Sequence, residues 1–78
     1  PETEALVDLV LEWADNTGGR HRPMSIVDIG TGSGCILVTL LAELPFATGV
    51  GTDVSDDAIR VARGNAERHT VAARARFE

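Results

Sequence analysis

The segment "VDIGTGSGCI", residues 27–36, is the most informative part of the sequence about the fold. Three glycines, Gly30, Gly32 and Gly34, alternate with small hydroxyl residues directly after an apolar run. That run, residues 25–29, predicts a short buried strand. The leucine-rich segment 35–44, ended by a proline, predicts a helix that is buried on most sides. The glycines therefore form a turn between a strand and a helix, where open α/β sheets bind their ligands.

The flanking segments continue the alternation of helices and strands. Residues 1–15 predict a helix, capped by Thr3 and ended by the Asn-Thr-Gly-Gly sequence at 16–19. Residues 47–54 predict a second strand, Ser55 the cap of a third helix, and residues 73–78 the start of a third strand. This order indicates βαβ units, a parallel sheet and right-handed crossovers.

Several side chains are expected to build the core. On the first helix, an apolar stripe follows helical spacing and includes a tryptophan as a core anchor: Leu6, Leu9, Val10 and Trp13. The third helix should turn its small residues toward the sheet: Ile59, Ala62 and Ala66. Cys35 is read as a small core residue, whereas His21 and His69 are read as solvated histidines that form no metal site.

Composition narrows the class of protein. The chain has 78 residues, a net charge of −5 and one cysteine. One domain at most fits this length, and direct nucleic-acid binding is not expected without a basic face. The lone cysteine and the lack of a signal peptide predict a cytoplasmic protein. No apolar run approaches the roughly 20 residues that span a bilayer.

An acid beyond the turn indicates what the turn binds. Asp53 ends the second strand, at the distance of about 20 residues where an acid accepts hydrogen bonds from ribose hydroxyls. Gly30 should permit the sharp turn, Gly32 the approach of a ligand, and Gly34 the packing of the helix on the strand. Free N–H groups at the helix start should attract a carboxylate or another anion. Turn and acid together predict a nucleoside-containing cofactor.

Charge favours S-adenosylmethionine among such cofactors. The dinucleotide fingerprint G-x-G-x-x-G would need a third glycine where Cys35 stands. Asp28, two residues before the first glycine, would repel a pyrophosphate and suit a cationic ligand. S-adenosylmethionine carries a sulfonium and an ammonium group beside its ribose, and we expect it here.

Three pieces of the sequence resemble a known family. "DIGTGSG" is similar to motif I of class I S-adenosylmethionine-dependent methyltransferases, and "GTDVS" to their acidic motif after the second strand. "PETEALVD", "VDIGTGSGCI" and "GTDVSDDAIRVARGNAERH", in this order, resemble the protein-(glutamine-N5) methyltransferases of the HemK/PrmC family, which modify peptide chain release factors. The resemblance implies a Rossmann-like fold with a parallel sheet. Residues 1–78 would be the amino-terminal half of its S-adenosylmethionine-binding domain, an incomplete fragment of about three strands and three helices.

The resemblance also implies roles for individual residues. Gly30, Thr31, Gly32 and Gly34 would line the methionine portion of the cofactor. Asp28 would orient that end, Asp53 would hold the ribose, Val54 would touch the adenine and Thr3 would border the cofactor. The Asn-Pro-Pro-Tyr motif with which the family grips its target amide does not occur in the sequence. No residue is identified as catalytic, and we expect the segment alone to be inactive.

Other interpretations stay open. The cofactor half would also serve another class I methyltransferase, one that acts on nucleic acid or on a ribosomal protein. The chain could instead be a non-catalytic nucleotide-binding segment, while an NAD-dependent oxidoreductase fits less well. A small parallel sheet with an unpaired edge also predicts that the isolated segment is marginally stable or self-associates.

Overall fold

A computed structural model describes residues 2–78. The elements follow in the order α1 (Glu2–Asn16), β1 (Met24–Ile29), α2 (Cys35–Glu43), β2 (Ala47–Thr52), α3 (Asp56–Arg68), a 3-10 turn η1 (Ala72–Arg74) and β3 (Ala75–Phe77). The alternation predicted from the sequence is confirmed, with most boundaries shifted by one or two residues. Pro1, which opens the "PETE" match, lies outside the described residues.

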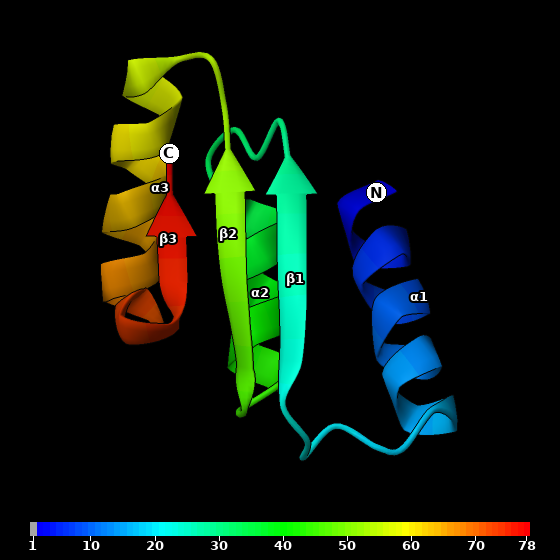
Figure 1. Ribbon diagram of the computed structural model, residues 1–78. Coiled ribbons are helices and arrows are strands. Elements are labelled where there is room, and N and C mark those ends of the chain that lie inside the picture. The colour runs from blue at the N-terminus through cyan, green and yellow to red at the C-terminus, as the bar shows by residue number, and fades with distance from the viewer. Residues whose placement is uncertain (1) are drawn as a thin grey trace.

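The three strands form one parallel sheet in the order β1-β2-β3 (Figure 1). Met24 pairs with Ala47 at one end of the β1–β2 ladder, and Ile29 pairs with Thr52 at the other. β3 pairs with residues 49–51 of β2, from Gly49 opposite Ala75 to Gly51 opposite Phe77. The parallel pairing brings the carboxyl ends of β1 and β2 to the same edge of the sheet.

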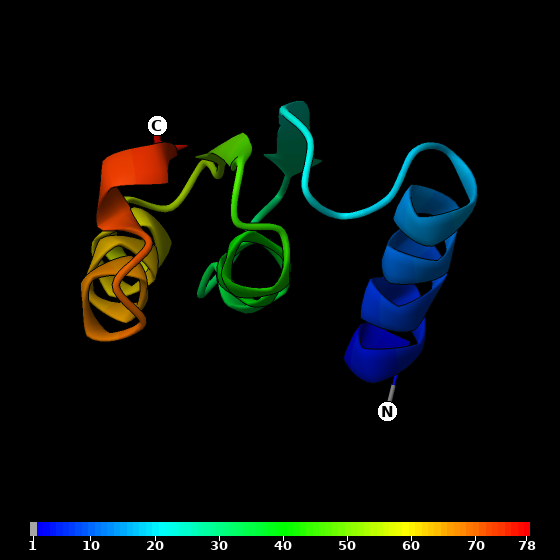
Figure 2. The same cartoon turned by 90° about the horizontal axis from the view of Figure 1, so that it is seen from below.

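All three helices lie on one side of the sheet, with α2 between α1 and α3 (Figure 2). Within residues 2–78, the opposite face of the sheet carries no helix. On that face Val27 is exposed and Ile29 is 85% exposed. The prediction that β1 is a buried strand is therefore wrong for one of its faces, because periodicity alone does not tell how many layers cover a sheet.

The core lies between α2 and the sheet. Leu37, Leu41 and Leu44 are its largest fully buried side chains. β2 makes room for them with Gly49, where a Cβ would lie 2.5 Å from Leu37 Cδ1. The predicted stripe of α3 is confirmed as buried, and its alanines let the helix pack closely.

α2 is anchored at its carboxyl end by one arginine. Arg74, in η1, donates to the carbonyl oxygens of Leu41, Leu44 and Ala47 at 2.8–3.0 Å. The last carbonyls of a helix lack partners within the helix, and they carry partial negative charge. One guanidinium therefore ties the end of α2, the start of β2 and η1 together.

The buried face of α1 differs from the predicted one at three of its four residues. Leu6, Leu9 and Trp13 are exposed, Leu9 by 63% and Trp13 by 54%. Val10 is partly buried against the core, as predicted. α1 packs on α2 through the next face around, with three buried residues: Val7, Leu11 and Ala14. α1 is apolar on both of these faces, so helical spacing selects either one. The small Ala14 decides in favour of the second face, because it lets α1 approach its neighbour.

Two further predictions about helix starts are wrong. α1 begins at Glu2, so Thr3 lies inside the helix and does not cap it. Cys35 is exposed at the first turn of α2 and is not a core residue. By contrast, the cap predicted for α3 is confirmed, since Ser55 Oγ accepts a hydrogen bond from Ala58 N–H at 3.2 Å.

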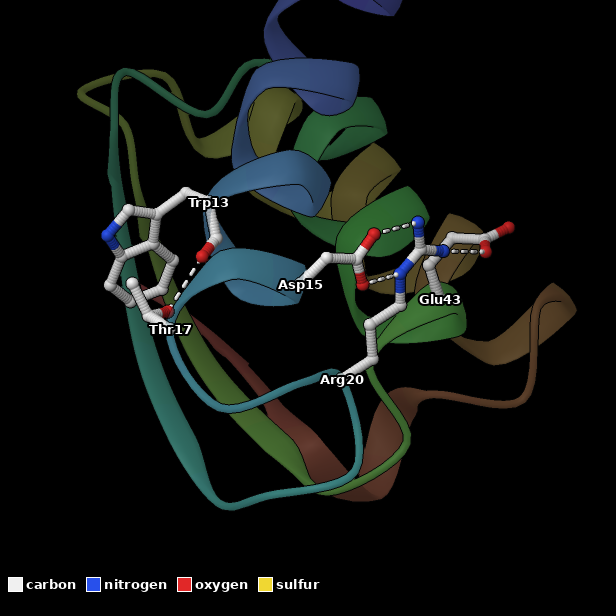
Figure 3. A network of polar contacts seen from close by, with 5 residues as sticks. All are labelled: Trp13, Asp15, Thr17, Arg20 and Glu43. Carbon is white, nitrogen blue, oxygen red and sulfur yellow. Dashed lines mark hydrogen bonds and ion pairs between the residues drawn. The ribbon is translucent and has the colours of Figure 1, made fainter.

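An ion-pair network joins the ends of two helices (Figure 3). Arg20 donates to both carboxylate oxygens of Asp15, at 2.8 and 3.0 Å, and its guanidinium lies 3.6 Å from Glu43 at the end of α2. The Arg20 guanidinium lowers the pKa of Asp15 below its ordinary value.

Across residues 2–78, no helix has the length and apolar character needed to cross a membrane.

Candidate functional site

The glycine turn lies where β1 ends and α2 begins, at the carboxyl edge of the sheet. Gly30, Gly32 and Gly34 have φ angles of 73°, 57° and 76°. Left-handed backbone of this kind favours glycine because a Cβ would clash with the chain itself. The prediction of a turn that depends on its glycines is therefore confirmed.

The three glycines differ in what surrounds them. At Gly30 and Gly32 a Cβ would meet no atom within 4 Å beyond the adjacent residues of the chain, so both positions face open space. At Gly34 a Cβ would lie 2.9 Å from Ala62 Cβ and 3.2 Å from Phe77 Cε1. Gly34 thus lets the turn pack against α3 and β3, whereas the sequence predicted that it packs on its own strand.

Asp28 and Thr31 hold one side of the turn. Thr31 is buried, and its hydroxyl donates to Asp28 Oδ2 at 2.9 Å. The Thr31 N–H donates to the Thr52 carbonyl of β2 at 2.8 Å. Asp28 therefore faces the turn as predicted, and Thr31 connects the turn to both strands.

Asp53 holds the other side of the turn. Its Oδ2 accepts the Gly32 N–H and its Oδ1 accepts the Ser55 N–H, both at 2.9 Å. These hydrogen bonds from Ser55 and Gly32 lower the pKa of Asp53 below its ordinary value, since they favour the charged form. A carboxylate has about four acceptor sites, so Asp53 can still accept from a ligand.

The N–H groups of the turn are less free than the sequence predicted. Those of Thr31 and Gly34 donate to the carbonyls of Thr52 and Thr31, and that of Gly32 donates to Asp53. Two carboxylates thus face a turn in which these three donors are already engaged. This arrangement disfavours a phosphate, which would need free donors and no nearby negative charge.

A hollow of about 470 Å³ opens beside the turn. It is lined by residues that end the two strands or follow them: Ile29, Gly30, Thr52, Asp53 and Val54. Val54 is fully exposed. The structure therefore brings three of the predicted residues, Gly30, Asp53 and Val54, to one hollow. Ile29 and Thr52 were missed, although their place at the ends of paired strands could have indicated them.

Thr3 belongs to a different hollow. It lines a space between α1 and α2 together with Cys35, Thr39 and three residues of α1. Cys35 directly follows Gly34, so this second hollow lies on the α1 side of the turn.

In the part of the chain that the structure describes, no three His, Cys, Asp or Glu side chains gather as ligands for a metal ion.

The fold and the site together define a class of protein. A parallel sheet with a glycine turn after its first strand and an acid after its second is a nucleoside-binding α/β domain. Solved structures of this class share the fold. An RNA methyltransferase from Salinibacter ruber, in complex with S-adenosyl-L-homocysteine, superposes with a TM-score of 0.75 at 32% identity over 95% of this chain and 45% of its own. An S-adenosylmethionine-dependent methyltransferase from Geobacter sulfurreducens, with the same compound, gives 0.75 at 27% identity over 100% and 28%. The predicted Rossmann-like class I methyltransferase fold is confirmed.

The sequence comparisons specify the family. Residues 20–78 match the profile of a family described as a methyltransferase domain. The chain belongs to this methyltransferase domain family. Release factor glutamine methyltransferases from Rhodospirillum rubrum and Chlorobaculum tepidum are each 47% identical to it over 99% of its length. The predicted resemblance to the release factor methyltransferases is confirmed. The chain spans 22% and 26% of the length of these two relatives.

Proposed function

We propose that this chain binds S-adenosylmethionine, and that the whole protein methylates the side-chain amide nitrogen of a glutamine in peptide chain release factors. The similarity at 47% identity to relatives named for this activity carries the proposal. Within the whole protein, the chain would provide the amino-terminal half of the cofactor-binding domain. The target, the partner and the reaction are proposed for the whole protein, because the chain spans about a quarter of those relatives.

The residues present fit the proposed cofactor. The open positions at Gly30 and Gly32 leave room for a ligand against the backbone. Asp53 is ionised at neutral pH and has acceptor sites left for ribose hydroxyls. Val54, fully exposed beside the hollow, offers an apolar contact for a base. Asp28 adds negative charge near the turn, which suits the cationic end of S-adenosylmethionine and not a pyrophosphate.

The residues of the chain would bind and orient; they would not perform proton transfer. When bound, S-adenosylmethionine supplies an electrophilic methyl group on its sulfonium. The hydrogen bond between Thr31 and Asp28 holds one side of the glycine turn. The hydrogen bond between Gly32 and Asp53 holds the other side. An amide nitrogen is a weak nucleophile because its lone pair is delocalised, so alignment of the reacting atoms is the main contribution to expect from the protein. We propose no catalytic residue among the 78, and we expect the chain alone to be inactive.

The proposed reaction is tested with the whole protein, isotope-labelled S-adenosylmethionine and a release factor. Label should enter the release factor, and peptide mass spectrometry should place one added methyl group on a glutamine. Asp53→Asn should lower the rate, whereas Asp56→Asn, which removes an exposed charge from the first turn of α3, should not. Label that enters no release factor would overturn the proposed substrate.

A second candidate function is methyl transfer to nucleic acid, because the RNA methyltransferase of S. ruber has the same fold. The net charge of −5 disfavours direct binding of nucleic acid by this chain. Parallel assays with total RNA and with ribosomal protein separate these targets from release factors.

A cytoplasmic location is also proposed, and it is supported by a free, exposed cysteine that a reducing compartment would keep as a thiol.

A further inference from the structure

We propose that Asp53 has a second role as the positioning residue of the glycine turn. Its carboxylate holds the Gly32 N–H and thereby fixes the shape of the turn before any ligand binds. The contact to a ribose rests on the proposed function, whereas this hold on the turn does not. Asp53 then couples the two parts of the site, because the same carboxylate positions the turn and faces the hollow.

The geometry of the carboxylate supports this role. Gly32 and Asp53 are 21 residues apart in sequence, on the loops that follow β1 and β2. One carboxylate oxygen binds the turn, and the other binds the Ser55 N–H at the start of α3. The backbone of Asp53 is itself restrained at the edge of the sheet, since its N–H donates at 3.3 Å to the carbonyl of Glu78, which directly follows β3. The side chain thus bridges the β1–α2 turn and the β2–α3 loop from a restrained backbone position.

The turn needs such a restraint at Gly32. A glycine with open space around it has many accessible conformations, and fixing it costs conformational entropy. Thr31 is held by Asp28 and β2, and the carbonyl of Ser33 accepts a hydrogen bond from Asn65 of α3. Asp53 supplies the corresponding bond to the residue between them. Four hydrogen bonds thus hold three consecutive residues of the turn, from β1, β2, the β2–α3 loop and α3.

This role has a consequence for ligand selection. Because Asp53 occupies the Gly32 N–H, that group is not offered to an anion, and a negative charge stands in its place. A nucleoside with a 5′-phosphate should therefore bind less tightly than the same nucleoside without it. Asp53, expected from the sequence only to hold the ribose, would thus also select against a 5′-phosphate through its contact with the turn.

Hydrogen exchange of the Gly32 amide tests the proposal without any ligand. The whole protein is labelled with ¹⁵N-glycine, the Gly32 signal is assigned by its loss in Gly32→Ala, and exchange is compared in wild type, Asp53→Ala and Asp56→Ala. Alanine has no side-chain acceptor, so the Gly32 N–H loses its partner in Asp53→Ala. Exchange at Gly32 should become about tenfold faster in Asp53→Ala and stay unchanged in Asp56→Ala. Equal exchange at Gly32 in all three proteins would overturn the proposal.

A pH titration of the wild-type protein keeps the test valid if Asp53→Ala fails to fold. The chemical shift of the Gly32 amide should follow the Asp53 carboxyl signal with the same midpoint; a Gly32 shift that ignores the carboxyl would contradict the hold. Titration with S-adenosyl-L-homocysteine separates this proposal from the proposed function. Protection of Gly32 that depends on Asp53, in a protein that binds no such ligand, would leave the positioning role standing and remove the methyltransferase role.

Discussion

The tight packing of Gly34 leads to a quantitative prediction about stability. In Gly34→Ala the new Cβ would lie 2.9 Å from Ala62 Cβ, which sits on the rigid backbone of α3. Overpacking of this kind costs about 1–3 kcal/mol. The φ of 76° adds about 1–2 kcal/mol, because it is left-handed. The expected loss is therefore about 2–5 kcal/mol.

Gly32→Ala is the matched control for this substitution. Its φ of 57° brings a similar backbone cost of about 1–2 kcal/mol, but its Cβ would meet nothing within 4 Å. Urea unfolding of the whole protein, followed by far-ultraviolet circular dichroism, gives both losses of free energy. The Gly34 variant should lose about 1–3 kcal/mol more than the Gly32 variant. Equal losses would refute the argument that Gly34 is required by its contacts with α3 and β3.

Three further predictions concern stability and association. Arg74→Met should lower the free energy of unfolding by about 2–4 kcal/mol, because three carbonyls lose a charged donor; Arg60→Met, which breaks an exposed ion pair, should cost under about 1 kcal/mol in the same urea assay. The lowered pKa of Asp53 stabilises the fold fully above the ordinary aspartate pKa of 3.8, and this stabilisation is lost as the pH falls through the lower folded-state value. The urea midpoint should therefore fall less on acidification in Asp53→Asn than in wild type, and parallel pH profiles would speak against the hydrogen bonds of Asp53. The isolated 78-residue chain should be marginally stable or self-associate, since the exposed sheet face carries Val27 and Ile29; light scattering that finds a stable monomer with a cooperative thermal transition would contradict this.

The order of elements was predictable because each signal is local. Three such signals act on the backbone within a few residues of themselves. They are the glycines between an apolar strand and an apolar helix, the serine before two acids, and the proline after the leucine-rich helix. Ser55 illustrates this point, since its cap depends on a residue three positions away. The buried face of α1 was not predictable, because it depends on which of two apolar faces fits against α2. Trp13 was assigned to the core by its helical spacing, yet it is exposed and Ala14 is buried in its place.

The site was predictable to a similar extent. The sequence indicated that Gly30, Asp53 and Val54 belong together, because the ends of parallel strands meet at one edge. It did not indicate that Asp53 binds the Gly32 N–H, since a contact across 21 residues depends on strand register. The same applies to Gly34, whose neighbours Ala62 and Phe77 come from elements that only the fold brings near.

Calorimetric titration of the whole protein with S-adenosyl-L-homocysteine and, in parallel, with NAD tests the cofactor site directly. S-adenosyl-L-homocysteine should bind and NAD should not. Asp53→Ala should weaken the binding of S-adenosyl-L-homocysteine, whereas the control Asp56→Ala should leave it unchanged. Binding of NAD alone would contradict the choice of cofactor. Binding of neither compound by the folded protein would contradict the central claim that the glycine turn and Asp53 form a nucleoside-cofactor site.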